Sequence, residues 1–288
     1  MTAQLDLAII GGSGLYSMPG LTDTSEHVID TSFGKPSSPI IIGTLEGKRI
    51  AFIARHGLGH FITPTEVNYR ANILALKMLG TTRIVSISAC GSLREDYKPG
   101  DIVIPDQIFD NTKERARTFF GDGMVAHVGV ADPFCQDLSQ RVYEAVLGCG
   151  SSVHKGGTLI TIEGPRFSTK AESNVFRAWG MSIIGMTASP EAFLAREAEM
   201  CYTTMAHVTD YDVWHVSSEP VTVDMVIQTL NKNTSAAQES IRLLVNNLEK
   251  PSSCNCHKAL SDALITDPGT IPATTRTKLD TIVGKYLK

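Results

Sequence analysis

The chain has 288 residues, 42% hydrophobic and 19% charged, a composition typical of a folded protein rather than a disordered one. Its net charge of -4 and pI near 6.1 provide no overall positive field, which argues against partners such as nucleic acid or an anionic membrane. The N-terminal segment lacks a signal-peptide pattern, and no apolar run has the length of a membrane-spanning helix, so we expect a cytoplasmic protein.

Short runs rich in aliphatic and β-branched residues recur along the chain and alternate with helical patterns. Their order predicts an α/β fold, with a mixed, largely parallel central sheet covered by helices. The predicted strands are residues 7–10, 50–54, 83–88, 101–105, 158–162, 182–186 and 202–208.

The predicted helices begin at capping residues and carry apolar positions at helical spacing. Thr63–Glu66 forms a capping box, and Gly80 can end the helix that follows it. No repeat, low-complexity tract or long linker divides the chain, so residues 1–288 are expected to form a single domain. The remaining predicted helices are 132–148, 190–200, 222–248 and 275–287, with a loop at 251–255.

Six cysteines are too few for a disulfide scaffold in a chain of this length. Cys254 and Cys256 form a Cys-Asn-Cys sequence, which could be a strained redox pair or half of a zinc site. No second paired cluster has metal-ligand spacing, so two ordinary thiols in a loop are favoured and no metal site is expected.

Small and polar residues follow three of the predicted strands, where open α/β sheets bind ligands. The first group contains Ser13, the second Arg55 and His56, and the third Ser88 beside Ala89. Residues 11–14 match neither the dinucleotide fingerprint nor the nucleophile elbow, because positions 17 and 15 are not glycine. Each group alone could be a tight turn or a surface ion pair. Together they favour an anion site in which the guanidinium grips two oxygens and the imidazole donates a further bond.

A second set of residues suits a planar heterocycle. Phe167 stands beside Ser168 in a loop and could stack on a ring, although a lone phenylalanine is more often in the core. Asp210 and Asp212 follow the last predicted strand, one residue apart. They could face a purine edge or belong to a solvated acidic turn.

Six segments lie in an order and at a spacing typical of one family. With them, the chain resembles the methylthioadenosine phosphorylase branch of the trimeric purine nucleoside phosphorylase family, from the glycine-rich turn to about Leu248. The resemblance implies a twisted central sheet surrounded by helices, and a homotrimer with active sites near subunit boundaries. The segments are ARHG (54–57), NYRANI (68–73), ACGSLRE (89–95), PGDIV (99–103), IEGPRFS (162–168) and TDYD (209–212).

The resemblance also implies roles for individual residues. His127 is expected near the 5' end of the substrate of a neighbouring subunit. The phosphate site would contain Ser13, Arg55, His56, Ser88, Ala89 and Thr187. The base and ribose would contact Phe167, Ser168, Met186, Asp210 and Asp212. The 5' end would contact His60, His127, Val223, Val226 and Ile227.

The family's reaction is phosphorolysis, with inorganic phosphate as co-substrate and neither a cofactor nor a metal. Asp210 is the expected general acid at N7 of the purine, and an aspartate there favours a 6-amino base, so methylthioadenosine is the expected nucleoside. Gly185 stands where animal relatives have asparagine, and Ser13 and Ser88 where close relatives often have threonine. A phosphorylase for methylthioinosine or other purine nucleosides is therefore an alternative, and a non-catalytic nucleotide-binding protein is a remote one.

Overall fold

The computed structural model describes residues 5–12, 18–215, 223–248 and 254–287, except for the side chains of residues 223–233. Its strands form one eleven-stranded sheet. In chain order they are β1 (Leu7–Gly11), β2 (Thr22–His27), β3 (Ile40–Leu45), β4 (Lys48–Ala54), β5 (Arg83–Ser92), β6 (Ile102–Ile104), β7 (Gln107–Asn111), β8 (Val153–Lys155), β9 (Thr158–Ile162), β10 (Ile183–Gly185) and β11 (Cys201–Asp210).

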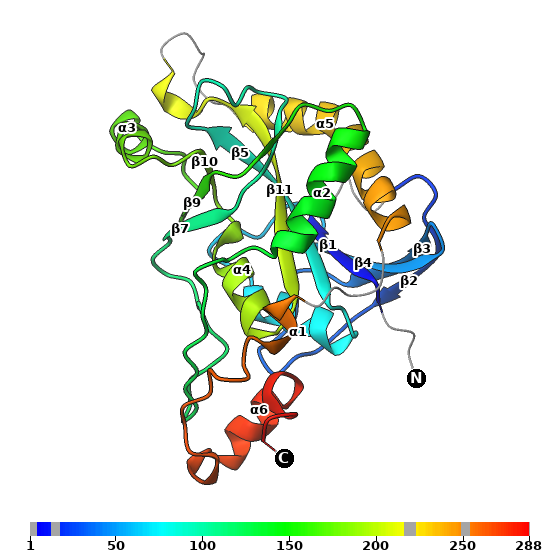
Figure 1. The fold of residues 1–288 in the computed structure, drawn as a ribbon, viewed down its shortest axis with the longest axis vertical. Helices are drawn as coiled ribbons and strands as arrows, with labels where there is room; N and C mark the ends of the chain where they lie inside the picture. Colours follow the sequence, from blue (N-terminus) through cyan, green and yellow to red (C-terminus); the bar gives the residue numbers. More distant parts are fainter. Residues whose placement is uncertain (1–4, 13–17, 216–222, 249–253, 288) are drawn as a thin grey trace.

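Helices alternate with these strands and surround the sheet (Figure 1). Their arrangement confirms the predicted α/β class with a mixed central sheet. All the described strands share one sheet, which agrees with the expected single domain, although the domain boundaries themselves stay a prediction. The α-helices are α1 (Tyr69–Met78), α2 (Gln136–Gly148), α3 (Lys170–Ala178), α4 (Ala188–Glu197), α5 (Val223–Asn246) and α6 (Ala273–Val283).

Four neighbouring strands at the centre of the sheet run parallel, in the order β4, β1, β5 and β11. Their carboxyl ends therefore meet at one edge of the sheet, which we call the motif edge. β10 runs antiparallel to the last residues of β5 and also reaches this edge. The topology thus brings together segments more than 150 residues apart, from residue 11 to residue 210.

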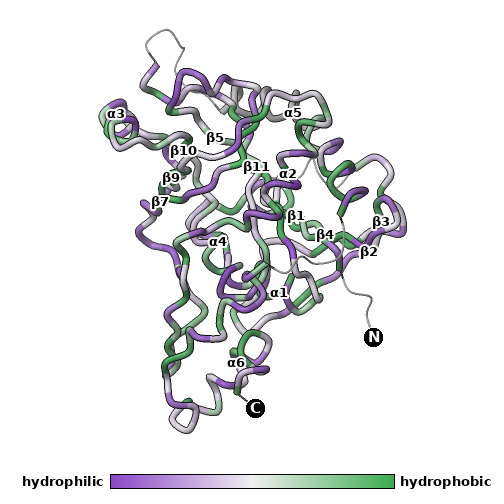
Figure 2. Tube along the Cα trace, viewed as in Figure 1, coloured by the Kyte–Doolittle hydropathy of each residue, from purple (hydrophilic) through white to green (hydrophobic). Residues whose placement is uncertain are grey.

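Both faces of the central strands are buried. Alternate side chains of a strand point to opposite faces of the sheet, so each central strand contributes to two cores. In β1, Leu7 and Ile9 pack in a core with α2 and α5, whereas Ala8 and Ile10 pack in a second core with α1, α4 and α6. Hydrophobic stretches of the trace accordingly lie around β1 and β4 in Figure 2. Burial on both sides is typical of parallel sheets covered by helices.

The C-terminal segment, which ends in α6, packs beside the segment that follows β7 (Figure 1). Phe119 and Met124 share a core with Leu279 and Ile282. The backbone N–H of His127 donates to the carbonyl of Ala263 at 2.9 Å. None of the helices in the described part of the chain is long and apolar enough to cross a membrane.

Helix α1 begins later than the capping box predicts. Thr63 and Glu66 do bond to each other, with Thr63 Oγ1 2.7 Å from Glu66 Oε2, but they form only a turn. The helix starts after Asn68, whose side chain accepts from the backbone N–H of Ala71 at 3.1 Å. It ends as predicted, with Gly80 at φ +81°.

The ends of the other predicted helices and strands differ from the observed ones by a few residues. Several observed elements have no sequence pattern that predicts them. Helices α2, α4 and α6 begin at Gln136, Ala188 and Ala273 rather than at 132, 190 and 275. Strands β2, β3, β7 and β8 were not predicted; β2 is polar and almost wholly exposed, so it has no hydrophobic alternation. Helix α3 was also missed, although Thr169 and Glu172 form its capping box.

Candidate active site

The motif edge holds most of the residues expected to bind phosphate. Gly11 lies beside Ala54, so the glycine-rich turn and Arg55 leave the sheet together. Ser88 and Ala89 lie on β5 beside Ala206 and His207 of β11. Ser13 lies outside the described residues.

Arg55 is buried and paired with a carboxylate that the sequence analysis did not single out. Its Nε is 2.8 Å from Glu191 Oε1, and its Nη2 is 3.0 Å from Glu191 Oε2. Nη2 also donates to Ser86 Oγ at 2.6 Å, and Nη1 donates to the carbonyl of Ile87 at 3.3 Å. Glu191 accepts a further bond, at 2.8 Å, from the hydroxyl of Tyr202.

These bonds change what Arg55 can offer to an anion. A guanidinium has five N–H donors, and within the described part of the chain four of them are used. One is left for a phosphate oxygen, rather than the two-oxygen grip expected from the sequence. Burial alone would lower the pKa of Arg55, but the charge and hydrogen bonds of Glu191 raise it above its usual value, so the group stays charged.

His56 lies next to Arg55 and is held in one tautomer. Its Nδ1 is 2.9 Å from the carbonyl oxygen of Ile62, which can only accept, so Nδ1 carries the proton. Burial and then the charge of Arg55 lower the pKa of His56 to about 4. At neutral pH its Nε2 is therefore a hydrogen-bond acceptor, rather than the donor expected from the sequence. The ring stacks on the exposed His60, with 4.5 Å between centroids.

The two aspartates of the TDYD segment lie at the end of β11, where Asp210 is partly buried and Asp212 is buried. Asp210 Oδ2 accepts from Thr209 Oγ1 and its Oδ1 from the backbone N–H of Asp212, both at 2.7 Å. Burial raises the pKa of Asp210, and burial together with the nearby charge of Asp210 raises the pKa of Asp212. Asp212 Oδ2 is buried without a hydrogen-bond partner in the part of the chain that the structure describes. This carboxyl pair therefore tends to keep a proton.

The loops on the base side come together around Arg115, which was not among the residues predicted from the sequence. Arg115 donates through Nη1 to the carbonyl of Met186 at 2.6 Å and through Nη2 to that of Glu163 at 2.7 Å. It thereby ties the loop of Phe167 and Ser168 to the segment that leads into α4. Arg115 lies in no recognisable motif, so nothing in the sequence pattern marked it.

The other predicted base and ribose residues lie on these two segments. Phe167 is 39% exposed, which leaves its ring accessible to a ligand. Thr187 is buried and precedes α4. Ser168 is buried, and its hydroxyl has no hydrogen-bond partner among the described residues. A small cavity of about 100 Å³ lies beside it, lined by Asn111, Lys113, Ile162, Glu163, Gly164, Arg166, Ser168, Glu172 and Phe176.

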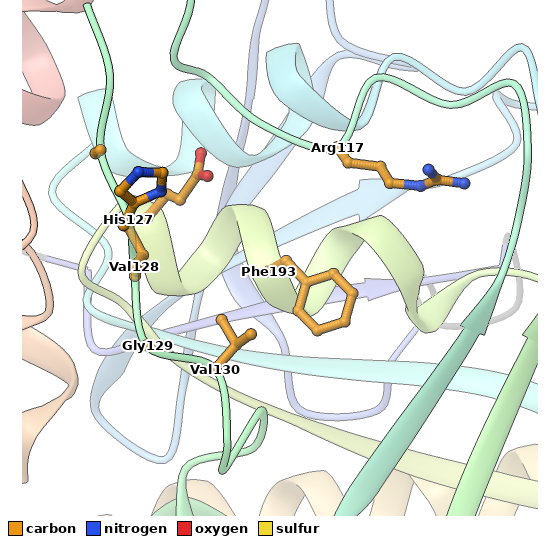
Figure 3. Close-up of a pocket in the computed structure, with 8 residues that line it drawn as sticks. Arg117, His127, Val128, Gly129, Val130 and Phe193 are labelled. Carbon is orange, nitrogen blue, oxygen red and sulfur yellow. The ribbon is translucent and has the colours of Figure 1, made fainter.

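His127 is not part of the motif edge. It lines a separate hollow of about 420 Å³, together with Arg117, Ala126, Val128, Gly129, Val130, Phe193 and Glu197 (Figure 3). None of these residues belongs to the expected phosphate site. The side chains of Val223, Val226 and Ile227 lie outside the described part, although their backbone forms the start of α5.

Comparison with known proteins shows the family of the chain. Residues 6–246 match the Phosphorylase superfamily. The chain is 52% identical to S-methyl-5'-thioadenosine phosphorylase of Koribacter versatilis over 283 residues, covering 98% of this chain and 97% of that one.

Solved structures show the same family. A methylthioadenosine phosphorylase from an Antarctic soil metagenomic library superposes with a TM-score of 0.93 at 48% identity, over 97% of this chain and 99% of that one. The Schistosoma mansoni methylthioadenosine phosphorylase in complex with adenine has a TM-score of 0.82 at 37% identity, over 90% and 96% of the two chains. The chain therefore belongs to the phosphorylase superfamily and, within it, to the family of S-methyl-5'-thioadenosine phosphorylases.

Proposed function

We propose that the protein is a pentosyltransferase that cleaves 5'-methylthioadenosine with inorganic phosphate, giving adenine and 5-methylthioribose 1-phosphate. Relatives that are about half identical over nearly their whole length are named for this nucleoside. The observation that carries the proposal is the partly buried carboxyl of Asp210, whose pKa is raised, on the same sheet edge as Arg55 and His56.

Phosphate is already an anion, so the reaction needs no serine or cysteine nucleophile and no cofactor to activate it. A phosphate oxygen bonds to C1' of the ribose as the bond from C1' to N9 of the purine breaks. Arg55 supplies positive charge, and the hydroxyl of Ser88 can donate a hydrogen bond to the phosphate. The bare Nε2 of His56 accepts the remaining proton of hydrogen phosphate, which orients that anion.

The purine leaves as a neutral base when N7 receives a proton. Asp210 supplies it, because burial keeps its acid form present to a higher pH than in an ordinary aspartic acid. The carboxylate that remains accepts from the 6-amino group of adenine or from its N7–H. Facing the 6-oxo group of hypoxanthine, the same carboxylate would place one acceptor against another, so the site favours 6-amino purines.

Three further parts of the proposal follow from the family resemblance. The protein would be a cytoplasmic homotrimer that acts in purine and methionine salvage. His127 would complete the 5' pocket of a neighbouring subunit; its place in a separate hollow, away from the motif edge, supports this role. Val223, Val226 and Ile227 would line the apolar part of that pocket, which suits a methylthio group better than a hydroxyl.

The test is a substrate panel of methylthioadenosine, methylthioinosine, adenosine and inosine, incubated with and without phosphate, with the free base measured by chromatography. We expect adenine release from methylthioadenosine to require phosphate and to give the highest kcat/KM. Base release at an undiminished rate without phosphate would identify a hydrolase and overturn the proposal. A preference for methylthioinosine would instead support the second candidate function, which the glycine at position 185 favours.

A further inference from the structure

Four cysteines from distant parts of the chain meet at one place in the fold. Cys135 is the N-cap residue of α2, and Cys201 is the first residue of β11. Cys254 and Cys256 belong to the Cys-Asn-Cys sequence at the start of the C-terminal segment. Their four sulfur atoms all lie within 4.8 Å of one another. Three of the side chains are buried and Cys254 is partly buried, so the cluster is enclosed by the protein.

The spacing of the sulfurs is close to that of a single tetrahedral metal site. Zinc binds thiolate sulfur at about 2.3 Å, which separates the four ligands of a tetrahedron by about 3.8 Å. Iron–sulfur clusters hold their cysteines farther apart, because several iron and sulfide atoms lie between the ligands. The sulfurs of Cys201 and Cys254 are 3.2 Å apart. All four are free thiols, whereas a disulfide joins sulfurs at about 2.05 Å.

We propose that Cys135, Cys201, Cys254 and Cys256 bind one structural Zn²⁺ ion through four thiolates. Four sulfur ligands and a closed coordination shell are characteristic of zinc sites that stabilise a fold, whereas catalytic zinc sites keep one position open. From the sequence, Cys254 and Cys256 could be half of a zinc site, but no second pair of cysteines has metal-ligand spacing. The fold supplies that half from two separate elements.

The surroundings of the cluster suit the charge of such a site. Zn²⁺ with four thiolates carries two negative charges, which need positive neighbours inside a protein. Arg196 Nη1 is 3.6 Å from Cys256 Sγ, and His257 Nε2 is 3.6 Å from Cys201 Sγ. His257 Nδ1 lies 3.1 Å from the carbonyl oxygen of Glu199, which holds the ring beside the cluster. The N-terminus of α2 adds a favourable dipole at Cys135.

The position of the cluster indicates a structural role. Cys201 and Asp210 stand at opposite ends of β11, a strand of ten residues that spans about 30 Å. The metal would therefore lie far from the reacting atoms. It would join the C-terminal segment to α2 and to the start of β11. The same segment is also attached to the turn before β11, where the backbone N–H of Leu260 donates to Glu199 Oε1 at 3.1 Å.

The experiment measures metal content and does not depend on activity. The protein is produced in zinc-supplemented medium, purified with a phosphine reductant, and analysed by mass spectrometry for metal per chain. We expect about one zinc per chain in the wild type and a loss of at least about tenfold in Cys254→Ser. Cys149→Ser is the matched control and should keep its zinc, because Cys149 lies outside the cluster and bonds to Ala145 and Ser240.

A second measurement uses the wild type alone, in case the serine variant does not fold. The protein is produced with Co²⁺ in place of zinc, and its absorption spectrum should show the intense bands of tetrahedral cobalt bound to thiolates. Wild-type protein that carries no zinc and takes up no cobalt would overturn the proposal. So would an intact mass lower by about 2 or 4 Da, with disulfides mapped among these four cysteines and no bound metal.

Discussion

At the scale of single residues, the buried pair of Arg55 and Glu191 decides how the anion site works. The carboxylate of Glu191 accepts hydrogen bonds from two N–H groups of Arg55 that were expected to bind phosphate. It also fixes the plane of the guanidinium, so the remaining donor is held in one orientation. Arg55 thus stabilises the fold and contributes charge to the site, and its two roles need a test that separates them.

Replacing one or both members of the pair separates the role of Arg55 in stability from its role in phosphate binding. Arg55→Met leaves Glu191 buried without its partner and should lower the free energy of unfolding by about 3–5 kcal/mol. Adding Glu191→Met replaces the ion pair by apolar groups and should recover most of that loss. The KM for phosphate should remain raised by about tenfold or more in both variants. Urea unfolding and phosphate titrations measure the two effects; recovery of the phosphate KM in the double variant would remove Arg55 from the site.

Asp210 is the residue expected to read and protonate the base. Asp210→Asn keeps the size of the side chain but removes its acidic proton, so kcat for methylthioadenosine should fall by about 100-fold or more. Because an amide can donate to a 6-oxo group, kcat/KM for methylthioinosine should fall much less. The control is Asp262→Asn at an exposed position. Equal loss for both nucleosides would mean that Asp210 does not distinguish the bases.

The wild-type pH profile tests the same residue. Since only protonated Asp210 donates to N7 and burial raises its pKa, kcat should fall as the pH rises through that raised pKa. The Asp210→Asn variant should lose this alkaline limb, because its amide does not titrate.

At the scale of elements, the end of β5 positions the catalytic aspartate. Gly91 pairs with Asp210 of β11 on one side and with Ile184 of β10 on the other, at the place where the register of β11 shifts. A Cβ on Gly91 would lie 3.0 Å from Asp210 Oδ1 and 3.0 Å from Ile184 Cγ2. Only glycine leaves room for β10 and β11 to approach β5 at this position. This explains the glycine in the ACGS sequence.

Gly91→Ala should therefore displace Asp210 without unfolding the protein. We expect kcat to fall by about 10- to 100-fold, because small displacements of a catalytic group have large effects on rate. The free energy of unfolding should change by less than about 2 kcal/mol. Gly148→Ala in α2 is the matched control, since its Cβ would meet only Leu243 Cδ1 at 3.4 Å. Unchanged kcat in Gly91→Ala would show that the aspartate tolerates this crowding.

At the scale of the whole molecule, the candidate residues fall into two places. Most lie on the motif edge, whereas His127 lies beside the C-terminal segment and lines its own hollow (Figure 3). Within one subunit, the position of His127 gives it no role in the reaction. An assembly in which one subunit brings His127 to the next subunit's motif edge would use both places.

Mixed assemblies test this arrangement. His127→Ala and Asp210→Asn chains with different tags are co-expressed, and hybrids are isolated by two successive affinity steps. Each variant alone should have low activity, whereas hybrids should recover a large part of the wild-type kcat/KM because some sites receive both intact residues. Hybrids made of two Asp210→Asn chains with different tags provide the control. Activity no higher than the mean of the parent variants would place His127 and Asp210 in the same subunit's site, or His127 in none.

The sequence by itself determined the central strands, the α/β class and the set of motifs, because these depend on local hydrophobic patterns and short segments. Residues such as Asp210 were found because they follow a strand in a recognisable segment. The tertiary structure decided the contacts between distant segments: Glu191 beside Arg55, Arg115 between two loops, and Cys135 and Cys201 beside the Cys-Asn-Cys sequence. It also decided the raised pKa of Asp210, since burial arises only when the whole chain packs around a residue.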